Sequence, residues 1–285
     1  MKHIVLAVLL SGFVSTGYAQ DKALLYEVSG KALAQPSYLF GTFHLLCPAD
    51  LQLTDATRRA VASAKQVYLE IDLDEPGLQI TMMAAMMLGS GRHLKDFLEA
   101  DDFTALDVYM KRNLGAGLTQ MGILKPVALS SFIAASMLNC EPASLDMTFA
   151  ELAGKDGKEV LGLETIEQQM AIFDAVSIGD QLKGLVDMAR KPEEAAKEFA
   201  DLLAAYKAQD LPLLMKLMSE SEFDGETEGF EEVLLDNRNM NWIPVIEKAA
   251  MNKPTFFAFG AGHLAGPKGV ISLLRQRGYT VKAVQ

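Results

Sequence analysis

Two segments at opposite ends of the chain show the same order of features, and this repeat constrains the fold most. Near the start, the apolar run Ser37–Phe40 leads into Gly41-Thr-Phe-His44. Near the end, Thr255–Phe259 leads into Gly260-Ala-Gly-His263. Each run has the length of a buried strand and stops at a glycine close to a histidine. An α/β fold presents functional side chains at such strand ends.

The residues around each histidine predict a β-α-β unit at each end of the chain. After His44, Thr54 is a predicted N-cap for a helix to about Ala64, and Gln66–Asp72 is a predicted strand. After His263, Pro267–Arg277 is a predicted helix and Tyr279–Val284 a predicted strand. Ala23–Val28 is a further strand. We therefore expect an α/β fold whose central sheet is built from β-α-β elements at the two chain ends.

The region between these units is mostly helical, and we expect it to form a large insertion over about residues 90–250. It contains one predicted strand, Glu159–Leu163, and two predicted flexible segments, Gly115–Gly117 and Glu220–Glu232. No proline-rich or serine-rich linker divides the chain. Residues 20–285 are therefore predicted to form one domain.

The first residues are predicted to be a signal peptide over residues 1–19. Lys2 precedes the apolar run Ile4–Leu10, and Gly17-Tyr-Ala19 resembles a cleavage site. The sequence therefore predicts export, to the periplasm or as a secreted protein. No later apolar run is long enough to span a bilayer.

Charge and cysteine content narrow the partners and the compartment. The net charge of −11 disfavours nucleic acid and anionic membranes as partners. Cys47 and Cys140 are the two cysteines, and in an exported protein they can form a disulfide or stay apart. A catalytic thiol is the weaker interpretation, because Cys47 follows an apolar pair rather than a basic cluster.

Polar side chains follow four of the predicted strand ends. Glu70 and Asp72 end one strand, Glu164 follows another, and His44 and His263 follow the two repeated runs. Strand ends in an α/β sheet converge, so we expect these residues to meet. Two imidazoles with carboxylates suit a divalent transition metal that activates water. Neither a His-Glu-x-x-His motif nor a Gly-x-Ser-x-Gly elbow is present.

Each candidate also has a structural interpretation. Glu164 precedes a predicted helix whose dipole favours a carboxylate. Arg238 could clamp a carboxylate or phosphate, or pair with nearby Asp236 or Glu232. His93 is predicted to be an ordinary loop residue. Met82, Met83, Met86 and Met87 fall on one helical face, which favours flexible core packing or an adaptable surface for an extended apolar substrate.

Five motifs follow one another along the chain: Tyr38-Leu-Phe-Gly-Thr-Phe-His44, Tyr68-Leu-Glu-Ile-Asp72, Gly162-Leu-Glu-Thr-Ile-Glu-Gln168, Asn237-Arg-Asn239 and Phe259-Gly-Ala-Gly-His-Leu-Ala-Gly-Pro-Lys-Gly269. In this order they resemble the TraB/GumN family, which is similar to the Tiki metalloproteases and the pheromone-shutdown protein PrgY. The resemblance covers nearly all of the chain after residue 20.

The resemblance implies a metal-dependent hydrolase, most specifically a peptidase of Tiki-like type, with a peptide or other small substrate in a cleft. It implies manganese or cobalt as the ion, with zinc as an alternative. His44, His263 and Glu70 would be metal ligands, while Glu70, Glu164 and Arg238 would be catalytic or orienting residues. Two other functions remain open: a non-catalytic protein that sequesters a peptide, and a carrier of haem or metal. The oligomeric state is not predicted.

Overall fold

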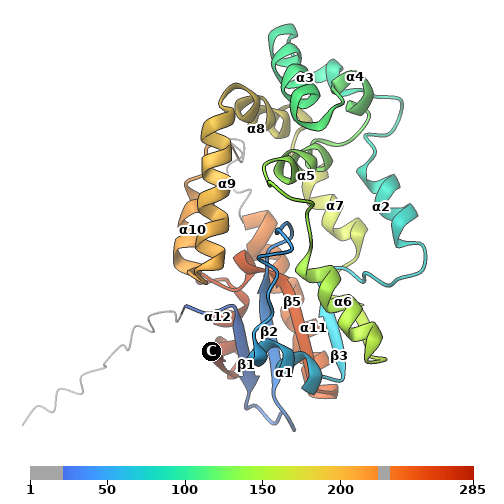
Figure 1. Cartoon of the computed structure of the whole chain (residues 1–285). Coiled ribbons are helices and arrows are strands. Elements are labelled where there is room, and N and C mark those ends of the chain that lie inside the picture. Colours follow the sequence, from blue (N-terminus) through green and yellow to red (C-terminus); the bar gives the residue numbers. More distant parts are fainter. Residues whose placement is uncertain (1–21, 224–231) are drawn as a thin grey trace, which may run out of the picture.

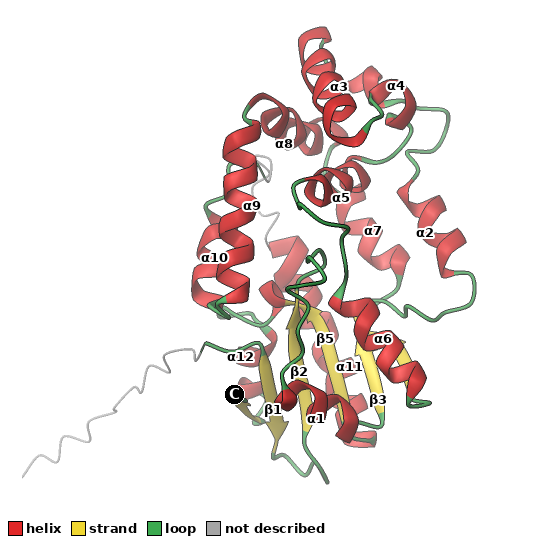
Figure 2. Cartoon of the chain, viewed as in Figure 1, coloured by secondary structure: helices red, strands yellow, loops and turns green. Residues whose placement is uncertain are grey.

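The computed structural model describes residues 22–223 and 232–285, where helices stand above one edge of a six-stranded mixed sheet (Figures 1 and 2). The strands are β1 (Leu25–Ser29), β2 (Ser37–Thr42), β3 (Gln66–Leu69), β4 (Glu159–Gly162), β5 (Thr255–Gly260) and β6 (Thr280–Ala283). The helices are α1 (Asp55–Ser63), α2 (Leu78–Met86), η1 (Leu94–Phe97), α3 (Ala100–Leu114), α4 (Leu118–Met121), α5 (Pro126–Ser136), α6 (Leu145–Lys155), α7 (Ile166–Asp174), α8 (Ile178–Arg190), α9 (Pro192–Lys207), α10 (Leu211–Ser219), η2 (Glu232–Asp236), α11 (Asn237–Asn252), η3 (Ala261–His263) and α12 (Val270–Gln276). The predicted signal peptide and most of the predicted flexible segment Glu220–Glu232 lie outside the described residues.

The sheet brings the two ends of the chain together. Its strand order is β4-β3-β5-β2-β1-β6; β4, β3, β5 and β2 are mutually parallel, and β1 is antiparallel to both β2 and β6. The neighbours β2 and β5 pair Gly41 with Phe259 and Thr42 with Gly260. Because these strands are parallel, their carboxyl ends lie at one edge of the sheet. The predicted α/β sheet built from the chain ends is confirmed.

The central strands β2, β3 and β5 are buried on both faces, as expected of parallel strands. Phe256, Phe257 and Phe259 of β5 are fully buried. On one face α6 packs against β3, β4 and β5, and its Phe149 contacts Phe256 with 4.8 Å between ring centroids. From α11, Trp242 contacts Phe259 at 5.5 Å. This core holds the strand ends rigidly in place.

The helical insertion has a hydrophobic core of its own. That cluster is formed chiefly by α3, α5 and α8 and includes Leu106, Met110, Leu129, Ile133 and Leu185. In Figure 2 these helices lie above the carboxyl edge of the strands. One part of the insertion returns to the sheet, because β4 pairs with β3 and α6 covers them. The predicted large helical insertion is therefore confirmed as a roof over the strand ends.

Two local expectations need correction. The last helix begins at Val270 rather than Pro267, because Gly266 has φ +86° and interrupts the chain before the helix. The four methionines do not share one face: Met82 lines a cavity, Met83 is 70% exposed, and Met87 lies beyond the end of α2. His93 lies in a loop, as predicted, and its ring accepts a hydrogen bond from the Lys95 N–H and caps η1.

Candidate active site

Four strand ends and one helix bring the predicted site residues together. Glu70 follows β3 directly, Glu164 lies two residues beyond β4, and His44 lies two residues beyond β2. His263 closes η3 after β5. The Glu70 Oε1 atom lies 3.8 Å from His44 Nε2 and 3.9 Å from His263 Nε2. The two histidines therefore face one carboxylate from neighbouring parallel strands.

The first glycine of each Gly-x-x-His segment permits this close approach. A Cβ atom on Gly41 would lie 3.0 Å from the Ala261 Cα atom and 2.7 Å from the Leu264 side chain. A Cβ atom on Gly260 would lie 3.2 Å from Glu70 Oε1. A side chain at Gly41 would thus separate the two loops, and one at Gly260 would crowd the carboxylate.

Arg238 is the buried centre of the network. Its Nη2 donates to Glu70 Oε2 at 2.6 Å and to Glu164 Oε1 at 2.7 Å, while Nε donates to Glu164 at 3.1 Å. Its Nη1 donates to the Leu234 carbonyl at 3.1 Å and to His263 Nε2 at 3.0 Å. All five N–H donors of the guanidinium are thus engaged. The alternative pairing of Arg238 with Asp236 or Glu232 is wrong, since Lys268 pairs with both of those carboxylates.

Glu164 is held in the same network. Its Oε2 atom accepts a hydrogen bond from Trp242 Nε1 at 3.1 Å, and its Oε1 atom accepts from Arg238. The Trp242 ring also lies 4.7 Å from the Arg238 guanidinium carbon. Thr165, the residue after Glu164, caps α7 with its side chain. Glu164 therefore faces Arg238 and Trp242 and leaves the capping of α7 to Thr165.

Glu70 is a buried carboxylate that stays charged. Burial alone would raise its pKa, but the positive charges of Arg238 and His44 and the hydrogen bond from the Gly260 N–H hold the pKa well below its usual range. The Gly260 N–H donates to Oε1 at 2.8 Å, and Gln169 Nε2 donates to Oε2 at 3.1 Å. The Oε2 atom is thus saturated, and Oε1 is the oxygen that faces the histidines.

His263 is buried and neutral. Its Nδ1 lies 2.7 Å from Asn239 Oδ1, and the Asn239 amide donates to the Lys268 carbonyl, which fixes the amide orientation. Nδ1 therefore carries the hydrogen and Nε2 accepts from Arg238. Burial lowers the pKa of His263 to about 3, and the nearby charge of Arg238 also favours the neutral ring. The ring packs against Trp242 with 4.4 Å between centroids and the ring planes tilted by 39°.

His44, in contrast, is exposed and positively charged. Its side chain is 62% exposed, and its Nδ1 donates to Asp146 Oδ2 at 3.0 Å. The enclosing walls lower the pKa of His44, but the hydrogen bond with Asp146 and the charge of Glu70 outweigh them and raise the pKa to about 9. Thr42 Oγ1 donates to the other oxygen of Asp146 at 3.0 Å. Asp146 thereby aims His44 Nε2 at Glu70.

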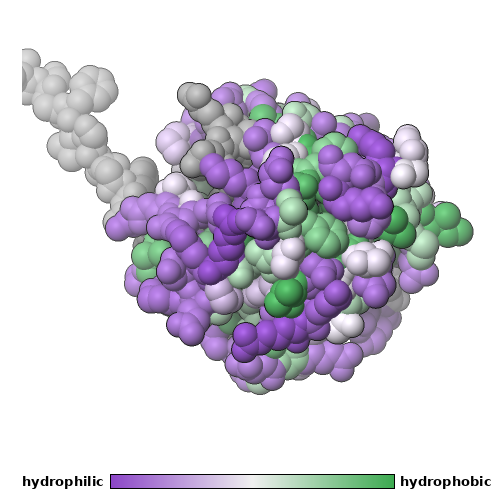
Figure 3. Space-filling view, turned by 90° about the horizontal axis from the view of Figure 1, so that it is seen from above, coloured by the Kyte–Doolittle hydropathy of each residue, from purple (hydrophilic) through white to green (hydrophobic). Residues whose placement is uncertain are grey.

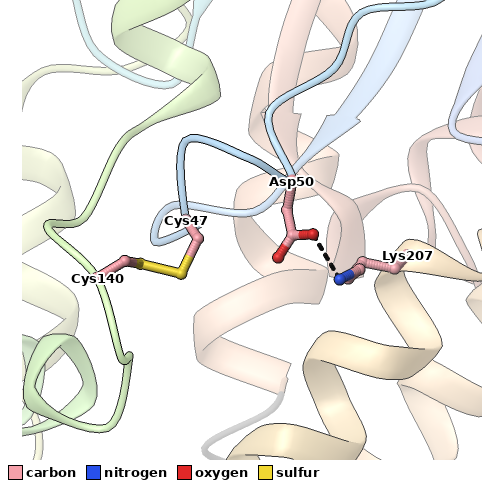
Figure 4. Close-up of a disulfide and its surroundings, with 4 residues drawn as sticks. All are labelled: Cys47, Asp50, Cys140 and Lys207. Atoms are coloured by element: carbon pink, nitrogen blue, oxygen red, sulfur yellow. Dashed lines mark hydrogen bonds and ion pairs between the residues drawn. A yellow bond between two sulfur atoms is a disulfide. The ribbon is translucent and has the colours of Figure 1, made fainter.

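A disulfide fixes the loop that carries His44. Cys47 lies on the loop after β2 and is bonded to Cys140 on the loop before α6 (Figure 4). Next to it, Leu46 and Ala143 exchange two backbone hydrogen bonds of 2.9 and 2.7 Å. The same loop is held to α9 by Lys207, which donates to Asp50 at 2.5 Å. The disulfide alternative is therefore the right one, and both thiols are consumed.

A cavity of about 600 Å³ opens above these residues. His44, Glu70, Arg238 and His263 are among its lining residues, together with apolar side chains from the helical roof. Phe43 and Leu45, which flank His44, also line it. The polar network is thus the floor of a pocket of the size that binds small ligands.

Comparison with known proteins supplies the family. A family model described as the TraB/PrgY/gumN family matches residues 24–283. The chain belongs to the TraB/PrgY/gumN family. The match covers all five segments on which the sequence resemblance rests.

Curated members with similar sequences are named metalloproteases. The chain is 23% identical to Metalloprotease TIKI2 of Danio rerio over 91% of its own length and 60% of that protein. It is 24% identical to Metalloprotease TIKI2 of Xenopus tropicalis over 87% of its length and 57% of that protein. Metalloprotease TIKI1 of Homo sapiens is 22% identical, with 87% and 59% covered. The chain thus corresponds to about three fifths of these relatives. No solved structure matches it.

The names of these family relatives raise the question of whether this floor can hold a metal ion. Imidazole nitrogens and carboxylate oxygens suit manganese, cobalt and zinc. His44 Nε2 and Glu70 Oε1 are open donors, whereas His263 Nε2 already accepts from Arg238. In residues 22–223 and 232–285, no three His, Cys, Asp or Glu side chains are arranged to hold a metal. The donor chemistry therefore fits a cation at His44 and Glu70. His263, the third predicted ligand, is hydrogen-bonded to Arg238 instead.

The sequence predicted which residues meet here, but it missed several of their partners. His44, Glu70, Glu164, Arg238 and His263 all lie in one contact network. Asp72 does not join it; burial, a side-chain hydrogen bond with Asp74 and the charges of Asp74 and Glu75 raise its pKa to about 6. The missed residues are Asp146, Gln169, Asn239 and Trp242. Two of them had a signal in the sequence: Asn239 belongs to the Asn237-Arg-Asn239 motif, and Gln169 ends the block Leu163-Glu-Thr-x-x-x-Gln169.

Among the described residues no helix is long and apolar enough to cross a membrane.

Proposed function

We propose that this protein is an exported, metal-dependent hydrolase of Tiki-like type that cleaves an amide bond of a peptide at the floor of the cavity. One observation carries the proposal: His44 Nε2 and Glu70 Oε1 face each other, 3.8 Å apart, beneath the cavity. The family relatives named metalloproteases support the same class of activity. Manganese, cobalt and zinc are the candidate ions.

In this proposal His44 and Glu70 would hold the cation. A divalent cation held there would lower the pKa of a water molecule and polarise a carbonyl oxygen. Glu70 suits the ligand role, because its low pKa keeps it charged and makes it a weak base. His44 must lose a proton before its Nε2 can bind a cation, and Asp146 keeps the hydrogen on Nδ1.

Arg238, Glu164 and His263 act in this proposal as positioning residues. The guanidinium holds Glu70 and Glu164 and also contacts His263, and no N–H is left for an oxyanion unless one of these bonds is released. Asn239 and Trp242 fix the remaining atoms of His263 and Glu164. A rigid network of this kind holds Glu70 within the narrow range of positions that catalysis needs.

A second candidate function is non-catalytic binding of a peptide in the same cavity. The engagement of His263 Nε2 by Arg238 favours it, because it removes the third predicted ligand from a metal site. Under this alternative the protein would sequester its ligand without turnover.

Cleavage assays on metal-stripped protein separate the two functions. The protein is treated with a chelator, and peptide hydrolysis is measured after addition of manganese, cobalt or zinc. The two matched variants are Glu70→Gln and Glu159→Gln. Glu159 is exposed and lies at the start of β4, the end of that strand opposite to the one that leads to Glu164. We expect cleavage only with metal, a loss of 10²-fold or more in Glu70→Gln and no change in Glu159→Gln. Peptide binding without cleavage under every metal would support sequestration instead.

A further inference from the structure

The walls of the cavity are hydrophobic and adaptable. Side chains from α2, α5, α7, α8, α9 and α10 reach into it. Six methionines are among them: Met82, Met86, Met137, Met170, Met188 and Met218. Methionine is unbranched and flexible, so a wall of methionines adjusts to the shape of an apolar ligand. The floor of the cavity is polar, and the walls above it have a different chemistry.

The polar groups on these walls already have partners inside the protein. Ser130 and Ser131 of α5 donate to the carbonyls of Pro126 and Val127 in the preceding turn, each at 3.1 Å. Ser221 donates to Glu198, a carboxylate that also lines the wall. Gln169 donates to Glu70. In the described part of the chain, the walls therefore offer few hydrogen-bond donors to a ligand.

This chemistry distinguishes a hydrocarbon chain from an extended peptide. A peptide backbone carries one N–H and one C=O per residue, and each one that is buried without a hydrogen-bond partner weakens binding. A hydrocarbon chain has no such groups and gains from every methylene it buries. The volume of about 600 Å³ lies within the range of known ligand sites. The walls therefore favour a flexible hydrocarbon chain.

We propose that the cavity binds the acyl chain of an N-acyl or O-acyl substrate, with the acyl carbonyl at His44 and Glu70. Binding of the acyl chain is inferred from the walls alone, whereas cleavage of the acyl bond rests on the proposed hydrolase function. In that step water adds its oxygen to the acyl carbon and the carbon–nitrogen or carbon–oxygen bond breaks. The products are a carboxylate and an amine or alcohol, which takes up a proton from water.

The outer side of α2 extends the same chemistry beyond the cavity. Ile80 is 78% exposed and Met83 is 70% exposed, while Met82 and Met86 of the same helix line the cavity. Seen from above, hydrophobic side chains gather on the right-hand side of the molecule, where Figure 1 places α2 (Figure 3). Apolar surface thus lies on both sides of this helix, but only its inner side, with Met82 and Met86, lines the cavity.

Binding is tested on metal-stripped wild-type protein, so that hydrolysis does not interfere. Calorimetry is run with N-acyl alanine amides of increasing chain length below their micelle concentrations, and with an uncharged apolar hexapeptide. We expect the dissociation constant to fall up to roughly fourfold per added methylene until the chain fills the cavity. Free fatty acids of the same lengths show whether a free acid or an acylated compound is preferred. Affinity that is independent of chain length, or tighter binding of the hexapeptide, would overturn the proposal.

A matched pair of variants tests whether the acyl chain binds in the cavity. Met82→Lys introduces a charge into the wall, whereas Met83→Lys introduces it on the exposed side of the same helix. We expect at least tenfold weaker binding of long chains in Met82→Lys and unchanged binding in Met83→Lys. Equal effects of the two variants would contradict binding in this cavity.

A second matched pair measures the depth of the cavity. Ala134 of α5 lines it, and the neighbouring Ala135 does not. Ala134→Trp should shorten the longest chain that is bound, while Ala135→Trp should not. Binding that depends on chain length without any turnover would leave this inference standing and end the proposed hydrolase. Peptide turnover without acyl binding would do the reverse.

Discussion

The two Gly-x-x-His loops leave neighbouring parallel strands, yet their histidines are in opposite states. His44 is 62% exposed, bonded to a carboxylate, and has a pKa raised to about 9. His263 is 4% exposed, bonded to an amide and a guanidinium, and has a pKa lowered to about 3. The shared pattern places both rings near Glu70, and the neighbours of each ring decide its chemistry.

The difference suggests a division of labour within one motif. The loop of His44 faces the cavity and is held from outside by the disulfide and by Asp146. The loop of His263 is held from within by Trp242, Asn239 and Arg238. His44 can thus contact a ligand in the cavity, whereas His263 helps to hold Arg238 and its two carboxylate partners in position.

The largest expected effect comes from removing the disulfide that anchors the His44 loop. Cys47 and Cys140 are 93 residues apart, so their bond restricts a long stretch of the unfolded chain. Replacing both by alanine should lower the free energy of unfolding by about 4 kcal/mol. Urea denaturation of oxidised wild type and the double variant measures the difference. A loss below about 1 kcal/mol would mean that the backbone pairing of Leu46 with Ala143 holds the loop alone.

The next effect separates the two histidines directly. His263→Ala removes a fully packed ring and leaves polar partners unpaired, so it should cost about 3 kcal/mol of unfolding free energy. At pH 9.5, where His44 has lost the proton that it gains on folding, His44→Ala should cost less than about 1 kcal/mol because the ring is exposed. Both variants are compared by urea denaturation without metal. Equal losses would contradict the assignment of one ring to structure and the other to the cavity.

A smaller effect is expected from the residue that orients His44. Asp146→Asn removes the charge that raises the pKa of His44 and weakens control of its tautomer. We expect hydrolysis or metal affinity to fall 10–100-fold, with little change in the affinity for acyl ligands. Asp156→Asn, at the exposed end of α6, is the control. A variant that keeps full activity and an unchanged His44 pKa would show that Asp146 does not act on the ring.

The smallest effect is the pH dependence of stability in metal-free protein. The His44 contribution is complete below the unfolded pKa of about 6.5 and is lost as the pH rises through about 9, because the folded state holds the proton more tightly. The His263 contribution is complete above about 6.5 and is lost as the pH falls towards 3. Denaturation of wild type and His44→Gln across this range measures the first window. A stability difference that does not shrink between pH 6.5 and 9 would contradict it.

Much of this arrangement could be predicted from the sequence, because local patterns determine it. Apolar runs ending in Gly-x-x-His predicted β2 and β5, and the rule that ligands gather at strand ends brought His44, Glu70 and His263 together. The glycines that allow the approach, Gly41 and Gly260, belong to the same pattern.

The remaining contacts depend on partners that are distant in the chain. Arg238 pairs with Glu70 across 168 residues, and its sequence neighbours Asp236 and Glu232 were more obvious partners. Asp146 lies in the first turn of α6, where an acidic residue is explained by the helix dipole. The protonation states of the two histidines follow from these long-range contacts, so the motif alone could not predict them.

Nuclear magnetic resonance of the imidazole nitrogens tests the central contrast most directly. The described residues contain three histidines, His44, His93 and His263, and single substitutions assign their signals. In metal-free protein at pH 7, we predict a charged His44 with both nitrogens protonated and a neutral His263 with the hydrogen on Nδ1. Addition of cobalt should perturb His44 first. Two neutral rings, or two rings that respond equally to cobalt, would contradict the account.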